Sequence, residues 1–98
     1  MYAQLRIFDT GNDSADELIA RLQSDIASVY TACDGFVGYF VVGSHTNRIE
    51  TVRIFYDKLT FDAATEAAHA AQEQIAADLA PDVDDYRLAG EIVISEWA

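Results

Sequence analysis

The sequence predicts an α+β fold of order βαββαβ, with a four-stranded antiparallel sheet and two helices on one face. Two apolar runs carry an arginine at the same place, LRIFD at 5–9 and VRIFYD at 52–57, so one strand pattern occurs in both halves. Each run is followed by a segment of helical periodicity and then by a further strand pattern. Two such βαβ halves form the ferredoxin-like arrangement, and residues 1–98 are expected to be a single domain.

The first half of the chain is expected to begin with a strand and a helix. Residues 2–8 alternate between apolar and polar or aromatic side chains, which is the period of a half-buried strand. Ser14 and Glu17 have the spacing of a capping box, so a helix is expected from about 15 to 33. Its apolar stripe has helical spacing: Leu18, Leu22, Ile26, Val29 and Cys33. Gly35, which can take the left-handed conformation, ends this helix.

The rest of the chain reads as a hairpin, a second helix and a last strand. The expected elements are a strand at 36–43, a turn at 44–47, a strand at 49–56, a helix from near Thr60 or Asp62 to about 80, and a strand at 86–97. Pro81 stops the second helix. The buried stripe of this helix is rich in alanine, which lets it lie close to the sheet: Ala64, Ala68, Ala71, Ile75 and Leu79.

Strand alternation divides the sheet residues between two faces. We assign the aliphatic set to the face under the helices: Ala3, Leu5, Ile7, Val52, Ile54, Ile92 and Ile94. The open face then receives a mixed set: Gln4, Arg6, Phe8, Thr51, Arg53, Phe55, Glu91, Val93 and Ser95. The strand order 4-1-3-2 makes strands one and three central neighbours, which we expect to be parallel, with Arg6 and Arg53 at matched positions. Because a face with exposed phenylalanines would be a sizeable apolar patch, we expect a two-fold dimer that buries it.

The composition excludes several classes of partner. Seventeen acidic residues against 6 basic ones give a net charge of −11, which argues against binding to nucleic acid or to anionic membranes. The longest apolar run, residues 36–43, is far shorter than the roughly 20 residues of a membrane span. A single cysteine and no secretory signal favour the cytoplasm. The acidity fits either a high-salt cytoplasm or an ordinary acidic protein.

Three segments resemble the antibiotic biosynthesis monooxygenase-like domains of the dimeric α+β barrel superfamily. They are GFVGYFVV after the first helix, TVRIFYD before the second, and GEIVI in the last strand. The resemblance implies a homodimer in which two sheets face each other and enclose a barrel. It also implies small molecules bound between sheet and helices or within the barrel. Members include cofactor-independent quinone-forming monooxygenases, haem-degrading enzymes, isomerases and proteins of no known activity, so the resemblance indicates architecture more than reaction.

His69 is the first residue to consider for chemistry. The haem-degrading branch implies a ligand histidine on the second helix, but also an asparagine on the first strand and a tryptophan near that helix, both missing here. His69 shares one helical stripe with Asp62, Glu66 and Glu73, opposite the alanine stripe, and is expected to face solvent. The EAAH spacing of paired-carboxylate metal sites has no second copy on the first helix. We therefore expect no metal and no cofactor.

Arg6 and Arg53 are the second candidates, and two interpretations remain open. In the structural one, Glu91 pairs with at least one guanidinium, with Glu50 as a further acceptor, because an unpaired buried charge is costly. In the other, surplus positive charge holds an anionic or phenolate-like ligand flanked by Phe8, Phe55 and Tyr2. The candidate ligand-binding residues are Gln4, Arg6, Phe8, Arg53, Phe55 and Glu91, and no catalytic residue is assigned. The function is then either that of a cofactor-independent oxygenase on an aromatic substrate or that of a non-catalytic ligand-binding or stress-associated domain.

Overall fold

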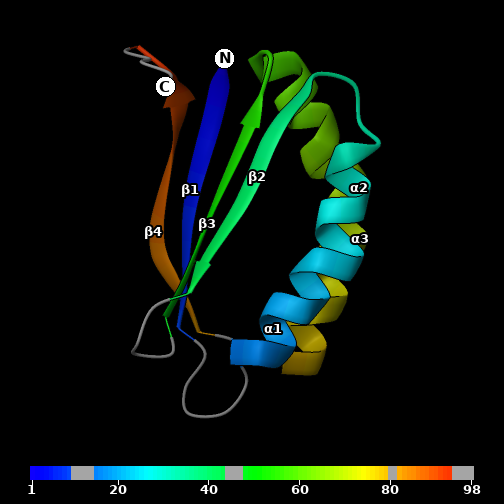
Figure 1. Ribbon diagram of the computed structural model, residues 1–98, viewed down its shortest axis with the longest axis vertical. Helices are drawn as coiled ribbons and strands as arrows, with labels where there is room; N and C mark the ends of the chain where they lie inside the picture. The colour runs from blue at the N-terminus through cyan, green and yellow to red at the C-terminus, as the bar shows by residue number, and fades with distance from the viewer. Residues whose placement is uncertain (10–14, 44–47, 80–81, 94–98) are drawn as a thin grey trace.

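The structure is a computed structural model that describes residues 1–9, 15–43, 48–79 and 82–93, without the side chains of 82–87. Its elements follow the predicted order βαββαβ (Figure 1). The bounds are β1 Tyr2–Asp9, α1 Ala15–Arg21, η1 Leu22–Ala27, α2 Ser28–Thr31, β2 Phe36–Gly43, β3 Arg48–Phe55, α3 Lys58–Leu79 and β4 Asp82–Glu91. The first predicted helix is therefore one helical segment, α1 to α2, with a π-helical middle, η1.

The sheet has the strand order β2-β3-β1-β4, which is the predicted order read from the other edge. All three strand pairs are antiparallel, so the expectation of parallel central strands was wrong. The βαβ crossover from β1 to β2 skips one position, and the hairpin strand β3 fills that gap in the opposite direction. The register also separates the two arginines: Arg53 lies opposite Gln4, and Arg6 lies opposite Thr51.

The helices cover the face of the sheet that the sequence assignment left open. Figure 1 shows both helical segments on one side of the sheet, with the other side bare. On β3 the buried side chains are Ile49, Thr51, Arg53 and Phe55, and the core joins strand residues to helix residues. The core consists of Phe8, Leu18, Leu22, Ile26, Tyr30, Ile49, Phe55, Phe61, Ala64, Ala68 and Ile75. Leu5 and Val52 of the aliphatic set instead lie on the bare face, because alternation separates two sets of residues without saying which set the helices cover.

The bare face carries an apolar row that crosses all four strands. Leu5 lies opposite both Val52 and Leu88, and Val52 lies opposite Phe40 on its other side. Phe40 is 55% exposed and Leu88 is 60% exposed. The second row, over Ala3 and Ile54, is apolar as well. The patch expected from Phe8, Phe36, Phe40 and Phe55 was therefore wrong, because Phe8 and Phe55 are buried under the helices; the apolar surface on the bare face combines Phe40 with aliphatic residues.

Helix ends agree with the local chemistry of the sequence. Gly35 has φ +77, the left-handed conformation expected after the first helix. Helix α3 begins at Lys58, earlier than predicted, because Asp57 accepts a 2.8 Å hydrogen bond from the backbone N–H of Thr60. The predicted roles of Ser14, the 44–47 turn and Pro81 lie outside the described residues, as do Ile94 and Ser95.

The first helix departs from ideal helical phase after Ile26. Leu18, Leu22, Ile26 and Tyr30, each four residues apart, are the buried side chains, whereas Val29 and Cys33 are half-buried. The π-helical segment η1 places more residues in each turn than an α-helix, which keeps this spacing on one face. None of the described helices is long and apolar enough to cross a membrane.

Candidate functional site

A cleft lies between the sheet and the helices. Its enclosed end has a volume of about 50 Å³. The lining residues there are Gln4, Arg6, Phe8, Leu18, Leu22, Ile26, Tyr30, Tyr39, Thr51, Arg53, Gln72, Ile75 and Ala76. An outer groove of about 300 Å³ adjoins it, lined by Gln4, Arg6, Arg53, Thr65, His69, Gln72, Glu73 and Ala76. Because five residues line both parts, the two form one continuous cleft that runs from the apolar interior to the surface.

Arg53 lies at the junction of the two parts and is only 5% exposed. Its Nε donates to Gln4 Oε1 at 3.1 Å, and one terminal nitrogen, Nη2, donates to Thr65 Oγ1 at 2.5 Å. The guanidinium lies over the Phe61 ring, with Cζ 3.6 Å from the centroid, and 5.0 Å from the centroid of Tyr30. The other terminal nitrogen, Nη1, is buried and has no hydrogen-bond partner.

The charge of Arg53 is not balanced by a carboxylate within the enclosed end. Burial lowers the pKa of Arg53, but an arginine side chain stays protonated in proteins. Gln4, Thr65 and three aromatic rings, those of Phe61, Tyr30 and Phe55, supply dipoles and π-faces instead of a negative charge. Arg6, with Cζ 5.0 Å from the Phe8 centroid, brings a second guanidinium to the same cleft. The enclosed end therefore contains two guanidinium groups inside an acidic protein.

Two tyrosines complete the enclosed end. Burial raises the pKa of Tyr30 and of Tyr39, so both hydroxyls stay protonated at neutral pH. Gln72 Nε2 donates to the Tyr30 hydroxyl oxygen at 2.9 Å, and the rings of Tyr30 and Tyr39 meet edge to face at 5.3 Å. Since the tyrosine oxygen accepts from Gln72, its own O–H remains a donor.

The predicted site residues are brought together only in part. Gln4, Arg6, Phe8 and Arg53 line the cleft, and Phe55 is fully buried beneath Arg53. Glu91 lies elsewhere: it is opposite Tyr2 in the sheet and pairs with the N-terminal ammonium at 3.4 Å. The predicted Glu91 bond to Arg53 is not made. The prediction that both arginines face a barrel interior was wrong too, because they lie on the helix side.

Sequence reasoning missed Tyr30, Tyr39, Thr65 and Gln72. The sequence contained a pattern that could have identified two of them, Tyr30 and Gln72. Tyr30 continues the four-residue spacing of the first helix, and Gln72 lies in the buried stripe of α3, four residues after Ala68. A polar residue in such a stripe needs a buried partner, which Tyr30 provides.

His69 lies at the outer groove on the solvent side of α3, as expected. Its side chain is 68% exposed, and Nε2 is 3.1 Å from Glu73 Oε1. Among the described residues there is no cluster of three or more potential metal ligands. The residues do not fit a haem enclosed beneath the helices with His69 as its ligand, because the enclosed end has room for little more than one or two waters.

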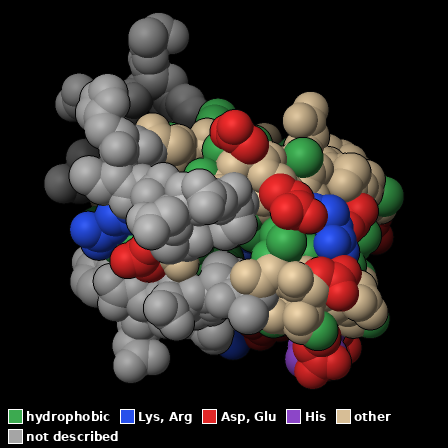
Figure 2. Space-filling model, turned by 90° about the horizontal axis from the view of Figure 1, so that it is seen from below, with side chains coloured by type: hydrophobic (Ala, Val, Ile, Leu, Met, Phe, Trp, Pro, Cys, Tyr) green, Lys and Arg blue, Asp and Glu red, His purple; other side chains and the backbone are tan. Residues whose placement is uncertain are grey.

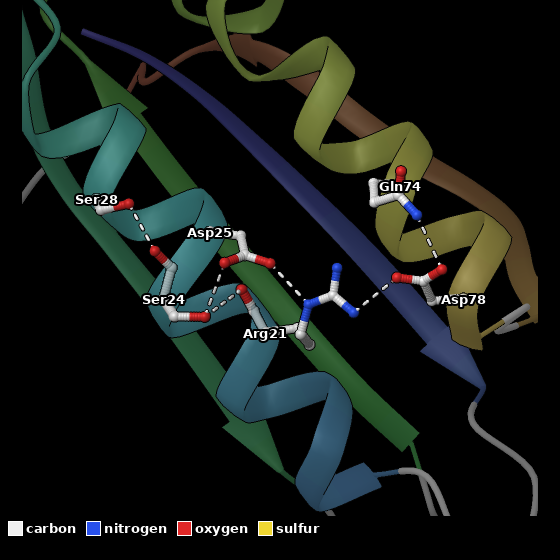
Figure 3. A network of polar contacts seen from close by, with 6 residues as sticks. All are labelled: Arg21, Ser24, Asp25, Ser28, Gln74 and Asp78. Atoms are coloured by element: carbon white, nitrogen blue, oxygen red, sulfur yellow. Dashed lines mark hydrogen bonds and ion pairs between the residues drawn. The ribbon is translucent and has the colours of Figure 1, made fainter.

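An ion-pair network fastens the two helical segments over the cleft (Figure 3). Arg21 Nε donates to Asp25 Oδ2 at 2.7 Å, and Arg21 Nη1 donates to Asp78 Oδ2 at 3.0 Å, which links the first helical segment to the end of α3. The bond from Arg21 lowers the pKa of Asp25. Ser24 adds a 2.9 Å bond to Asp25, and Gln74 a 2.9 Å bond to Asp78. Figure 2 shows acidic side chains gathered around a basic one on the described surface of the molecule.

No protein-family model matches the chain, and no curated protein matches it. Solved structures do. A protein from Deinococcus radiodurans described as an antibiotic biosynthesis monooxygenase has 13% identity and a TM-score of 0.80, covering 100% of this chain and 98% of that one. The cofactor-independent oxygenase SnoaB from Streptomyces nogalater has 12% identity and a TM-score of 0.80, with 96% and 94% covered. MhuD, solved with two manganese protoporphyrin IX molecules per active site, has 18% identity and a TM-score of 0.73, with 100% of both covered.

These likenesses confirm the predicted fold class. The chain is an α+β protein with the ferredoxin-like fold of the antibiotic biosynthesis monooxygenase-like proteins. At such identities the likeness establishes architecture, and the activities of those proteins remain their own.

Proposed function

We propose that this protein binds a small aromatic molecule in the cleft between its sheet and its helices. The observation that carries the proposal is the cleft itself, with aromatic and aliphatic walls and a few polar groups that converge at one point. This is the usual composition of a small-molecule site. Arg53, Gln4, Gln72 and Tyr30 are those groups.

In the catalytic form of the proposal, the protein is a cofactor-independent oxygenase that acts on an electron-rich aromatic. The likeness in fold to SnoaB supports this form. The protein would contribute position and desolvation, because the tyrosines of the enclosed end stay protonated and its described lining has no carboxylate or histidine to act as a base. The same lack of a placed base supports the second candidate, a non-catalytic ligand-binding domain.

A homodimer is part of the proposal. The row of Phe40, Val52, Leu5 and Leu88 on the bare face is an apolar surface of the kind that marks an interface, and none of the described helices lies over it. A second copy presents the same row and would pair with it about a two-fold axis. A cytoplasmic location also belongs here, supported by the single cysteine of the sequence.

Equilibrium dialysis against a panel of two-ring and three-ring hydroxylated aromatics tests the proposal. Ala76 lines both parts of the cleft, so Ala76→Trp should block it, whereas Ala77→Trp places the same ring on an exposed neighbour that does not line it. We expect binding by wild type and Ala77→Trp and none by Ala76→Trp. Equal binding by all three, or binding of no panel member, would contradict the proposal. Oxygen uptake with the bound compounds separates the oxygenase from the non-catalytic domain.

A further inference from the structure

We propose that the cleft holds an oxyanion-binding site, formed by Nη1 of Arg53 and the hydroxyl of Tyr30, which selects the ionised form of a phenol or enol. The inference rests on the proposed small-molecule function and names the chemistry of its ligand.

The first observation is the unused donor on Arg53. A guanidinium carries five N–H donors, and in this side chain Nε and Nη2 are engaged by Gln4 and Thr65 while Nη1 has no partner. The side chain is 95% buried, so bulk solvent does not supply the missing acceptor. Leaving a buried charged donor unsatisfied is unfavourable, and an oxygen that carries negative charge is the partner that relieves it best.

The second observation is the orientation of Tyr30. Its oxygen already accepts the Gln72 N–H, which leaves the tyrosine proton to donate. The ring lies 5.0 Å from Arg53 Cζ, and both residues line the enclosed end. A protonated hydroxyl and a guanidinium nitrogen from two residues that line one cavity are the elements of an oxyanion hole.

The geometry of the site favours a ligand that carries its charge on one oxygen over a carboxylate, which carries it on two. A carboxylate binds arginine best through two parallel N–H···O bonds, but two of the three nitrogens of Arg53 already have partners. A single nitrogen with a hydroxyl beside it suits a phenolate or enolate, whose charge lies on one oxygen. The enclosed end has room for the oxygen, and the ring of the ligand would extend into the outer groove of about 300 Å³.

The test uses 4-nitrophenol, whose phenolate absorbs visible light, together with 4-nitroanisole, which cannot ionise, and 4-nitrobenzoate. We expect the phenolate to bind at least about tenfold more tightly than the phenol, so that the bound probe ionises about one pH unit below the free probe. Arg53→Gln and Tyr30→Phe should each reduce that shift. Tyr30→Phe keeps the buried ring, so it reports on the donor even if Arg53→Gln folds poorly, and Lys58→Gln, which removes an exposed cation that lines neither part of the cleft, should keep the full shift.

The outcomes separate the inference from the proposed function. If 4-nitroanisole binds as tightly as the phenolate, and the bound phenol ionises at the pH of the free one, the oxyanion site is refuted and the aromatic cleft stands. Tighter binding of 4-nitrobenzoate would overturn the preference for one oxygen. If none of the three probes binds, both the site and the proposed function lose their support.

Discussion

Replacing Phe40 with alanine should break the proposed dimer. A phenylalanine buries about 200 Å² when it is fully covered. At 55% exposure, about 110 Å² of Phe40 remains to be buried by a second copy. At ~25 cal/mol per Å² this corresponds to about 2.8 kcal/mol in each protomer. A two-fold interface contains the residue twice, so the loss is about 5–6 kcal/mol for the dimer, or roughly a 10⁴-fold weaker dissociation constant.

Sedimentation velocity across a dilution series measures this change. Leu59 is the matched control, because it is 78% exposed in the first turn of α3 and does not belong to the apolar row. Leu59→Ala should leave the dissociation constant near that of wild type. The reasoning is refuted if wild type is monomeric throughout the series, or if the two variants dissociate at the same concentration.

Three further predictions concern stability. Gly35→Ala should cost at least roughly 1–2 kcal/mol in a denaturant melt, because the position has φ +77 and a Cβ would lie 2.5 Å from Thr60 Oγ1, whereas Gly90→Ala, with nothing within 4 Å, should change little. Asp25→Asn should lower the melting temperature at pH 7; the difference from wild type should begin to shrink near the unfolded pKa of about 3.9 and vanish only at lower pH, because the folded pKa of Asp25 is lowered and the stabilisation is lost as the folded carboxylate protonates. Melts in KCl should show a midpoint that rises with salt, because a net charge of −11 repels itself; a flat or falling midpoint would contradict this.

The order of elements was readable from the sequence because it depends on local patterns. The alternation of β1, the glycine after the first helix and the repeated strand pattern each act over a few residues, and each appears where it was expected. The π-helical turn was not readable, because the packing of Tyr30 under the helices fixes the phase there and the sequence shows only a four-residue spacing. The early start of α3 had a local signal, since Asp57 has the capping position three residues before Thr60.

The assignment of the two faces needed information that strand alternation does not contain. Hydrophobicity favoured the aliphatic set for the helix side, because a buried arginine appears costly on its own. The free-energy cost of burying Arg53 is smaller when the residues around it are taken into account. Helix α3 presents Thr65 as an acceptor and Phe61 as a π-face, and alanines beside them leave space for the long side chain. The aliphatic set then becomes available for a surface that a second copy can cover.

This reversal alters what the arginines can do. On a barrel interior, Arg6 and Arg53 of two copies would face one another across the two-fold axis, and a ligand would be shared between protomers. Beneath the helices, Arg6 and Arg53 line a cleft that is formed within a single protomer. The proposed ligand, entering through the outer groove, would then meet the buried guanidinium of Arg53 without crossing the proposed dimer interface on the bare face.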